Sequence, residues 1–501
     1  MISWIFLTCV IFIISFLWKK RWLLYHAWKI PGPFSVPLLG SAFLLSATKN
    51  NFFDLIYRTL DSCRPVTKFW AGSQLYIVTT RPTHVEKILT SCLGKSPFYD
   101  NLGSVIKDSL LTLKVSLWKE HRKMINPSFN SKILNSFHDV FVKYSKEMVK
   151  FLNDADGSEQ ANLVSVIWEK TLDISLRPTT WYYSCHEASP CSCLTLFINV
   201  DFRIEEIFIE RFHKFWLLID FVWKLSSLHK EYQAACQTSH GIAEDIIAEE
   251  HKSCGTETRN TLLSESIQFS GDIIRNELFL PRLNTLNHSN QITRKEILEE
   301  TSLMFVASSE TTALTVNMVL TILGIYPDIQ EKVFQELVSV LPTIEKDPTL
   351  KEISRLDYLD RVIKETLRLV PIVPFILRFT DEDIKCDSYV FPAGSNILVP
   401  IILLHRDPDV WPEPEKFNPD RFLPDEVAKR HRCSYIPFSF GSRNCIGLRY
   451  GMMLVKVMLA TILRSFKVQT VDLKSWKDIE WEYLIMLKPK NSRLLFEKRT
   501  F

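Results

Sequence analysis

Glycine is scarce in this sequence, with 14 glycines among 501 residues, and internal repeats and low-complexity tracts are absent. Because no repeat or flexible linker divides the chain, we expect one large globular unit. The formal net charge of +3 is too small to indicate a nucleic-acid-binding protein. A G-x-G-x-x-G fingerprint is also missing, so the chain itself is not expected to bind a flavin or a nicotinamide dinucleotide.

The eleven cysteines lack the regular spacing of a disulfide framework. Their number is odd, and only Cys191 and Cys193 lie close together. We therefore expect the main body of the protein to be reduced and to face the cytosol.

The N-terminal segment MISWIFLTCVIFIISFLWKKRW is apolar as far as Trp18 and is followed by three basic residues. A secretory signal peptide carries its positive charge before the apolar run, so this order favours a membrane anchor over residues 1–22 with the following chain on the cytoplasmic side. A buried core helix is the alternative. KIPGPFSVPLLG follows, and its prolines predict a stiff hinge over residues 23–36. Residues 37–501 are then expected to form a single domain.

Helical periodicity dominates the rest of the chain, which predicts a mainly α fold with a small β region. A β-hairpin is predicted over Val66 to Thr80 around Ala71-Gly72-Ser73, and a second short β region over Asp387 to Pro400. The longest helix is predicted from the N-cap Thr293 to Gly324. It is apolar or small on nearly every face, and Glu310 in its middle favours a central core helix over a membrane span.

A second helix, DYLDRVIKETLRLV, is predicted to start at an Asp357 cap and to end before Pro371. Glu365 and Arg368 lie at i and i+3 within it, and such a pair is ordinarily a solvated surface pair. LRPTTWYYSCHEASPCSCLTLF, residues 176–197, interrupts the helical pattern. We interpret it as a surface loop, and the alternative is a frame-slipped or mis-spliced stretch.

Cys445, in IPFSFGSRNCIGLRY, has five alternative roles: a buried apolar residue, half of a disulfide, a zinc ligand, a nucleophile or a haem ligand. Zinc needs three or four ligands at close spacing. Cys433 lies twelve residues away without a C-x-x-C, and His431 has no partner histidine. A nucleophile needs a nearby base that no motif supplies.

The neighbours of Cys445 match the pattern F-x-x-G-x-R-x-C-x-G. If Cys445 binds haem iron, Gly441 allows a tight turn and Gly447 leaves room for a porphyrin. Phe438 can shield the sulfur, and Arg443 can pair with a propionate. The apolar helix expected directly after the cysteine would favour a thiolate through its N-terminal partial positive charge.

The chain resembles the cytochromes P450, which are haem-thiolate monooxygenases. The resemblance rests on FSFGSRNCIG, ETLR, FNPDRF and ASSETT, which occur in the family's order and together cover essentially the whole chain. It implies the P450 prism fold, with haem between the long central helix and the Cys loop, and the N-terminal transmembrane helix of microsomal members.

The resemblance also implies roles for individual residues. Cys445 would be the proximal ligand of haem b, and Glu365, Arg368 and Arg421 would form a buried triad beneath it. Thr311 would hold oxygen and water, and Glu310 would relay protons from solvent. The alternative for both is a polar side chain that bonds back to the helix carbonyls. The haem edge would be held by Trp118, Arg122, Arg378 and Arg443.

The implied enzyme lies in the endoplasmic reticulum membrane with a single anchor and a cytoplasmic catalytic domain. It would insert one oxygen atom of O2 into a fatty acid, a hormone-like lipid or a xenobiotic. Its electrons would come from NADPH through NADPH–cytochrome P450 reductase, with cytochrome b5 as an optional second donor. A basic patch for the reductase is expected at Lys119, Lys123, Arg449 and Lys456, and a solvated face is the alternative.

Three features depart from the family pattern or stand apart from it. Ser308 replaces a usual glycine. The W-x-x-x-R-K-x-x-x-P-x-F layout is similar to the clan of fatty-acid ω-hydroxylases and many insect members, but Ala307 stands where several ω-hydroxylases carry a glutamate that binds haem covalently. FHKFWLLIDFVWKL, residues 212–225, is expected to line the entry channel, to meet the membrane surface or to pack in the core.

Two other functions therefore stay open. One is a non-catalytic haem-binding protein, impaired by Ser308 or by residues 176–197. The other is a haem-thiolate isomerase or dehydratase that needs no reductase, although Thr311 and Glu310 argue against it.

Overall fold

The computed structural model describes most of the chain. The described residues are 18–33, 40–41, 52–62, 64–102, 106–154, 163–179, 191–255, 277–343, 346–483 and 485–499, with Trp4, Ile11, Ser15 and Ser35 as single residues. Most of the predicted anchor, residues 1–22, lies outside them.

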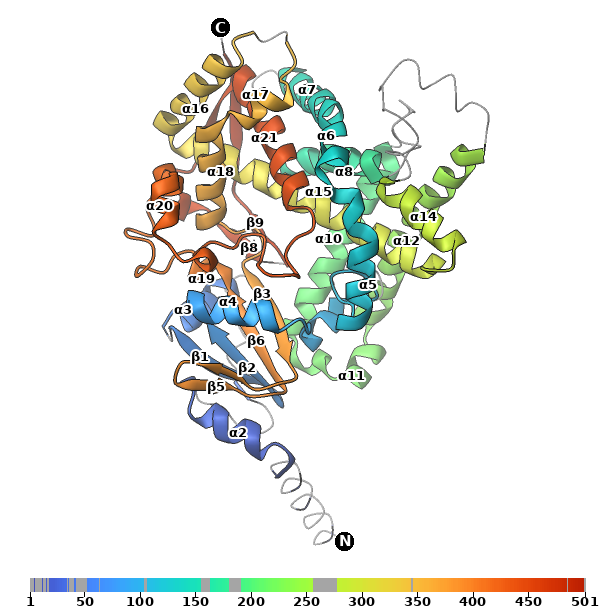
Figure 1. Ribbon diagram of the computed structural model, residues 1–501, viewed down its shortest axis with the longest axis vertical. Helices are drawn as coiled ribbons and strands as arrows, with labels where there is room; N and C mark the ends of the chain where they lie inside the picture. Colours follow the sequence, from blue (N-terminus) through green and yellow to red (C-terminus); the bar gives the residue numbers. More distant parts are fainter. Residues whose placement is uncertain are drawn as a thin grey trace.

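Helices make up most of the described chain, which confirms the mainly α prediction (Figure 1). The α-helices are α2 (Arg21–Trp28), α3 (Phe52–Asp61), α4 (Pro82–Ser91), α5 (Val115–Ile125), α6 (Ser131–Ser136), α7 (His138–Asp154), α8 (Leu163–Thr179), α10 (Cys191–His213), α11 (Asp220–Leu225), α12 (Ser227–Gly255), α14 (Phe279–His288), α15 (Arg294–Ile325), α16 (Pro327–Val340), α17 (Leu350–Ser354), α18 (Asp357–Leu369), α19 (Ile401–Leu404), α20 (Pro424–Ala428) and α21 (Leu448–Ser465). Short 3₁₀ turns are η3 (Pro97–Leu102), η4 (Asn126–Phe129), η5 (Phe215–Leu218), η8 (Pro419–Phe422), η9 (Arg432–Ser434) and η10 (Trp476–Asp478).

The main sheet has four strands in the order β1-β2-β6-β3. The predicted hairpin is confirmed as the antiparallel pair β1 (Val66–Ala71) and β2 (Gln74–Thr79). β6 (Ser395–Pro400) runs parallel to β2 and antiparallel to β3 (Phe375–Thr380). Three two-stranded pairs complete the β structure: β4 (Ile384–Cys386) with β5 (Tyr389–Phe391), β7 (Phe466–Thr470) with β10 (Leu494–Lys498), and β8 (Trp481–Tyr483) with β9 (Leu487–Pro489).

The long helix α15 crosses the middle of the molecule (Figure 1) and contacts α8, α12, α18 and α21. Its start agrees with the prediction, because Thr293 and Glu296 form a complete capping box. Among the described residues α15 is the one helix long and apolar enough to cross a membrane, and 78% of its apolar window is buried inside the protein. It is therefore a core helix, as Glu310 indicated.

Two local predictions need correction. The N-cap of α18 is Leu356 rather than Asp357, and the free amides of Tyr358 and Leu359 are satisfied by the Glu336 carboxylate of α16, at 2.7 and 2.9 Å. Residues 176–197 are not a loop at their ends, because residues 176–179 finish α8 and residues 191–197 begin α10. The part between them lies outside the described residues.

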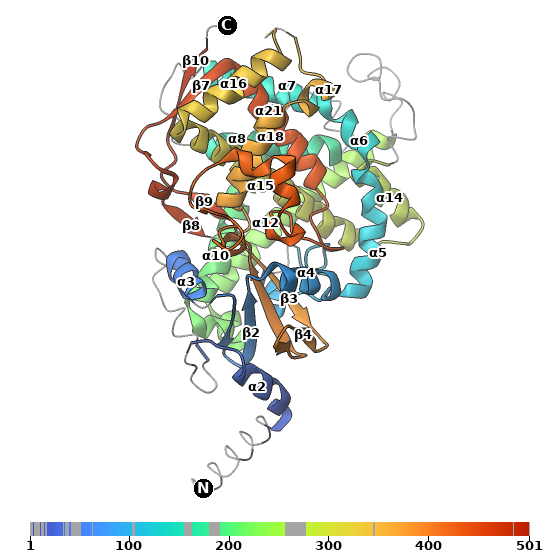
Figure 2. The same cartoon turned by 60° about the vertical axis from the view of Figure 1, so that its left-hand side comes forward.

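The predicted hinge begins inside a helix that packs on the sheet. Figures 1 and 2 place α2 at the end of the β1–β2 hairpin. Leu23, Ala27 and Ile30 are buried in the same apolar cluster as the sheet residues Leu75 and Ile77. Residues 21–30 are thereby held against the body of the protein.

Candidate haem-thiolate site

The Cys445 loop is held by its own backbone. The Cys445 amide donates to the Phe438 carbonyl at 2.9 Å, and the Asn444 amide donates to the Gly441 carbonyl at 3.2 Å. Gly441 has φ +77°, and a Cβ there would lie 2.3 Å from the Leu89 carbonyl oxygen. Only glycine fits this turn, for both its backbone angle and its packing.

Cys445 lies at the end of this loop, shortly before α21 begins at Leu448. Gly447 is the N-cap of α21, and its backbone N–H is directed at the Cys445 sulfur. A Cβ on Gly447 would meet only that sulfur, at 3.9 Å, so the space beside the thiol is open. Burial raises the pKa of the Cys445 thiol, while the Gly447 N–H and the nearby Arg122 charge act in the opposite direction.

A cavity of about 610 Å³ lies between the Cys445 loop and α15. Between residues 303 and 323, α15 is buried except at Val306, Ala307, Ser308 and Thr311, and all four line this cavity. Cys445 keeps exposed surface, although it lies deep inside the protein, because its free side faces the same cavity. The open face of the central helix and the thiol therefore share one enclosed space.

Among the cations that line this cavity, three have neither a carboxylate partner in the described part of the chain nor a hydrogen bond that satisfies their charge: Lys95, Arg378 and Arg443. Nε of Arg378 and both Nε and Nη1 of Arg443 are buried without a hydrogen-bond partner. Burial lowers the pKa of Lys95 well below its usual value, and the charges of the two arginines lower it further. Burial and the Arg378 charge lower the pKa of Arg443 to about 10. Buried charges of one sign without an anion are unfavourable, so the cavity wall is suited to a ligand with carboxylates.

Trp118 and Arg122 on α5 both contact the Cys445 loop. The Arg443 guanidinium lies 4.5 Å from the centre of the Trp118 ring, a cation–π distance. Arg122 donates to the backbone and side-chain oxygens of Asn444 at 3.0 and 3.1 Å. Both residues line the cavity. α5 therefore fixes the loop as well as part of the wall.

Thr311 and Glu310 point to different sides of α15. Thr311 lines the cavity, and its hydroxyl donates back to the Ala307 carbonyl at 2.8 Å, which is the alternative considered for a helical threonine. Glu310 is completely buried and does not line the cavity. Its carboxyl group contacts Lys488 of β9 instead.

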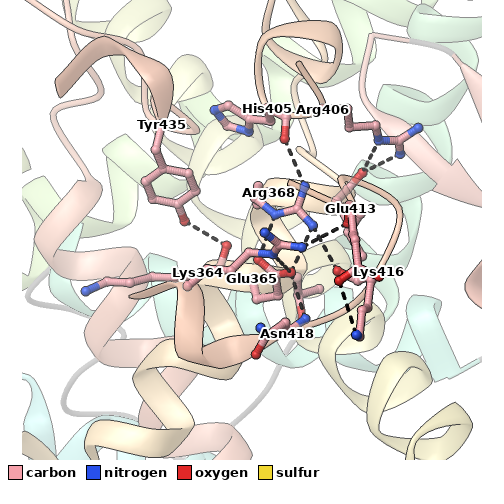
Figure 3. Close-up of polar contacts among 12 residues, drawn as sticks. Lys364, Glu365, Arg368, His405, Arg406, Glu413, Lys416, Asn418 and Tyr435 are labelled. Atoms are coloured by element: carbon pink, nitrogen blue, oxygen red, sulfur yellow. Dashed lines mark hydrogen bonds and ion pairs between the residues drawn. The ribbon is translucent and has the colours of Figure 1, made fainter. Parts of the chain in front are cut away.

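Glu365 and Arg368 lie together in the interior (Figure 3), and Arg421 reaches the same carboxylate. Arg368 Nε and Nη2 donate to the two oxygens of the Glu365 carboxylate at 2.7 and 2.9 Å. The Asn418 amide donates to the same carboxylate at 2.9 Å, and Arg421 Nε lies 3.4 Å from it. Arg368 also donates to the His405 carbonyl. Both side chains are fully buried, so the solvated pair suggested by the spacing alone is wrong, and the burial agrees with the triad that the family resemblance implies.

Cys433 and His431, weighed above as zinc ligands beside Cys445, lie in a different place. Their ligand atoms are within 4.8 Å of one another and of the Glu86 carboxylate. Arg432 already forms an ion pair with Glu86, and His431 Nε2 lies 3.0 Å from the same carboxylate; none of these residues lines the Cys445 cavity.

Comparison with known proteins agrees with this geometry. The model of the Cytochrome P450 family matches residues 30–496. The chain belongs to the cytochrome P450 family. It is 30% identical to "Cytochrome P450 4c3" of Drosophila melanogaster, over 97% of this chain and 92% of that protein. It is 31% identical to "Probable cytochrome P450 313a3" of the same fly, over 98% of each chain.

A human relative, "Cytochrome P450 4V2", is 30% identical over 92% of this chain and 88% of its own length. Insect P450s and members named as P450 family 4 are the clan that the motif layout predicts, so that prediction is confirmed. P450s are haem monooxygenases, and the three unpaired cations and the thiol of this cavity suit a haem with its propionates. Sequence reasoning missed Lys95 and the partner of Glu310, Lys488, because no motif surrounds either lysine.

Proposed function

We propose that this P450 is a membrane-bound monooxygenase that inserts one oxygen atom of O2 into a lipophilic small molecule. The observation that carries the proposal is the single cavity that the Cys445 thiol shares with the only open stretch of α15 between residues 303 and 323. Haem b bound there through a cysteine thiolate would supply the electron-rich iron that activates oxygen.

Residues from four segments would hold that cofactor. Cys445 would ligate the iron, and Phe438 beside it lines the same cavity. Lys95, Arg378 and Arg443 would pair with the propionates, because their unpaired charges need an anion. Trp118 and Arg122 keep the loop in place through the contacts described above.

Thr311 and Glu310 would control the protons that oxygen chemistry consumes. The Thr311 hydroxyl lies on the cavity wall, where it can hold water or a hydrogen-bonded oxygen atom. Glu310, one residue earlier, is the nearest carboxyl along the helix. Burial raises its pKa well above the usual value, with the Glu205 charge adding to this, which favours the protonated form that can act as an acid.

The substrate is expected to be apolar. The cavity is lined by aromatic and aliphatic side chains from η3, α10, β3, β8 and the loop before β9: Phe98, Tyr99, Ile209, Phe212, Phe375, Leu377, Tyr483 and Ile485. Fatty acids, hormone-like lipids and xenobiotics suit such a wall. Ala307 reaches the cavity and carries no carboxyl group for an ester to haem.

Ser308 does not favour the non-catalytic alternative. Its side chain is part of the cavity wall, but its hydroxyl donates to the Met304 carbonyl at 2.5 Å and is turned onto its own helix. The helix therefore keeps an open face beside Thr311.

Membrane attachment is supported by exposed apolar residues near α2. α11 lies at the same end of the molecule as α2 (Figure 1) and directly follows η5 in the chain. They expose Trp216, Leu218, Ile219, Phe221 and Leu225, whereas Leu217 and Trp223 pack inward. Together with the anchor predicted over residues 1–22, this patch would lie in the cytoplasmic face of the endoplasmic reticulum membrane.

Electrons would come from NADPH through NADPH–cytochrome P450 reductase, with cytochrome b5 as an optional second donor. Lys119, Lys123 and Arg449 are exposed and available to an acidic partner. Lys456 is not, because it is mostly buried and paired with Asp360 at 2.9 Å.

The test is turnover of the full chain with the reductase in lipid vesicles. NADPH consumption and hydroxylated products are measured across a panel of fatty acids, isoprenoid hormones and xenobiotics. Substrate-dependent product is expected, and Thr311→Ala should consume NADPH while forming less product. Thr321→Ala is the matched control, because its hydroxyl also bonds back to the helix but lies off the cavity. A normal thiolate spectrum without product from any substrate would contradict the proposal.

A further inference from the structure

Four ionisable side chains form a buried cluster behind the open face of α15. Glu310 comes from α15, Asp201 and Glu205 from α10, and Lys488 from β9. Each is at most 7% exposed. The cluster thus joins the central helix, the helix that forms part of the cavity wall and the C-terminal β hairpin.

Lys488 is the centre of this cluster. Its Nζ lies 2.7 Å from Glu205 Oε2, and it forms a second ion pair with Glu310 Oε1. The ammonium also lies 4.7 Å from the centre of the Phe202 ring and 5.1 Å from that of Trp168. Aromatic faces and carboxylates therefore enclose this cation.

One residue of the cluster, Glu205, reaches the cavity wall. Glu205 lines the cavity, whereas Glu310, Asp201 and Lys488 do not. Glu310 has no exposed surface, and its Oε2 and the Oδ2 of Asp201 have no hydrogen-bond partner in the described part of the chain. Polar contacts between described residues connect Glu310 to the cavity through Lys488 and then Glu205.

The pKa shifts of the cluster residues are consistent with a charged lysine among buried carboxyl groups. Burial by itself lowers the pKa of Lys488, but Glu205 and Glu310 outweigh it and raise the pKa, so the lysine stays charged. Burial, with repulsion from Glu205, raises the pKa of Asp201 to about 8. Burial therefore favours the protonated forms of Asp201 and Glu310, while the Lys488 ammonium offsets negative charge in the cluster.

We propose that Lys488 is a positioning residue that holds the Glu310 carboxyl behind α15 and links it through Glu205 to the cavity. One proton enters at Glu205 from cavity water for each proton that leaves Glu310, so the charge of the cluster is restored. The inference rests on the proposed function, because it takes Glu310 as the acid of the reaction.

The first test measures coupling, the moles of product per mole of NADPH, in the full chain with reductase. Glu310→Gln should lower coupling by roughly 100-fold, the typical contribution of a general acid. Lys488→Met should lower it by about tenfold, because a misplaced carboxyl is less effective than a held one. Lys488→Arg keeps the charge and should restore most of the coupling. Lys490→Met, two residues along and exposed, is the control and should match the wild type.

The double variant separates positioning from a general structural role. If Lys488 acts through Glu310, Lys488→Met should cause no further loss of coupling in the Glu310→Gln background. If Lys488→Met lowers coupling equally in the wild-type and the Glu310→Gln backgrounds, the inference is overturned. It is also overturned if Lys488→Met keeps wild-type coupling while Glu310→Gln loses it. If Glu310→Gln itself stays coupled, the proton role in the proposed function fails and the inference falls with it.

A measurement on the resting protein does not depend on turnover. The infrared difference between wild type and Glu310→Gln at neutral pH should show the carbonyl stretch of a protonated carboxyl. Lys488→Met should shift this band, and an unchanged band would contradict the positioning role. If Lys488→Met does not fold, Glu205→Gln replaces it, since it releases the lysine from its other partner at almost constant volume.

Discussion

The buried triad allows a stability prediction with a definite size. Glu365→Gln keeps the shape of the side chain but removes its charge and turns an amide towards the Arg368 guanidinium. Two charge-assisted hydrogen bonds, of 2.7 and 2.9 Å, are weakened or lost, and each contributes about 1.5–3 kcal/mol. Arg368 is also left as a buried charge without its full partner. We expect the free energy of unfolding to fall by about 3–5 kcal/mol, the usual cost of breaking a buried pair.

The assay is equilibrium denaturation followed by tryptophan fluorescence and haem absorbance on the same samples. Glu426→Gln is the matched control, because Glu426 and Lys429 have the same i, i+3 spacing at 2.6 Å but are exposed. That variant should unfold like the wild type. A Glu365→Gln protein as stable as the control would refute the reasoning, since it would mean that burial adds nothing to this pair.

Three further predictions concern the cavity and its supports. Lys95→Met should release haem faster than the wild type while leaving the haem-free protein as stable or more stable, because an unpaired buried charge is removed; haem transfer to apomyoglobin and apoprotein melting measure the two effects, and slower release would contradict the anion-binding role. Gly441→Ala should cost more than the about 1–2 kcal/mol of a left-handed backbone, because its Cβ also meets the Leu89 carbonyl, and haem content after purification should drop; full content would show that the loop tolerates a side chain. Burial lowers the pKa of His121, but Glu300 at 2.7 Å and Glu296 together outweigh it and raise the pKa. These contacts should therefore stabilise the fold below the ordinary histidine pKa of about 6.5 and lose that effect as the pH rises through the folded value; denaturation at several pH values should show a decline that His121→Gln flattens, and equal slopes would disprove the linkage.

Local signals in the sequence predicted the parts of this molecule that depend on neighbours along the chain. Thr293 and Glu296 are three residues apart, so the sequence predicted both the capping box and the start of α15. The same holds for the β1–β2 hairpin and for the tight turn at Gly441, whose pattern spans ten residues. The lack of a polar face predicted a helix that is buried or spans a membrane, and Glu310 in its middle identified α15 as a core helix.

Contacts between segments that are distant in the sequence could not be predicted from it. Glu205 and Lys488 are 283 residues apart, and only the fold brings them together. Lys95 was missed because it follows a helix without any motif, and it gains its significance from Arg378 and Arg443. The spacing of Glu365 and Arg368 indicated a pair but not its burial, which depends on the elements packed around it; only the family resemblance implied that the pair is buried.

The central claim is that Cys445 is the thiolate ligand of a haem in this cavity, and the carbon monoxide spectrum of the reduced protein tests it most directly. The full chain should show the red-shifted Soret band that a thiolate ligand produces. Cys445→Ala should lose this band, while Cys433→Ala, a buried cysteine outside the cavity, should keep it. A thiolate band that survives in Cys445→Ala would contradict the account.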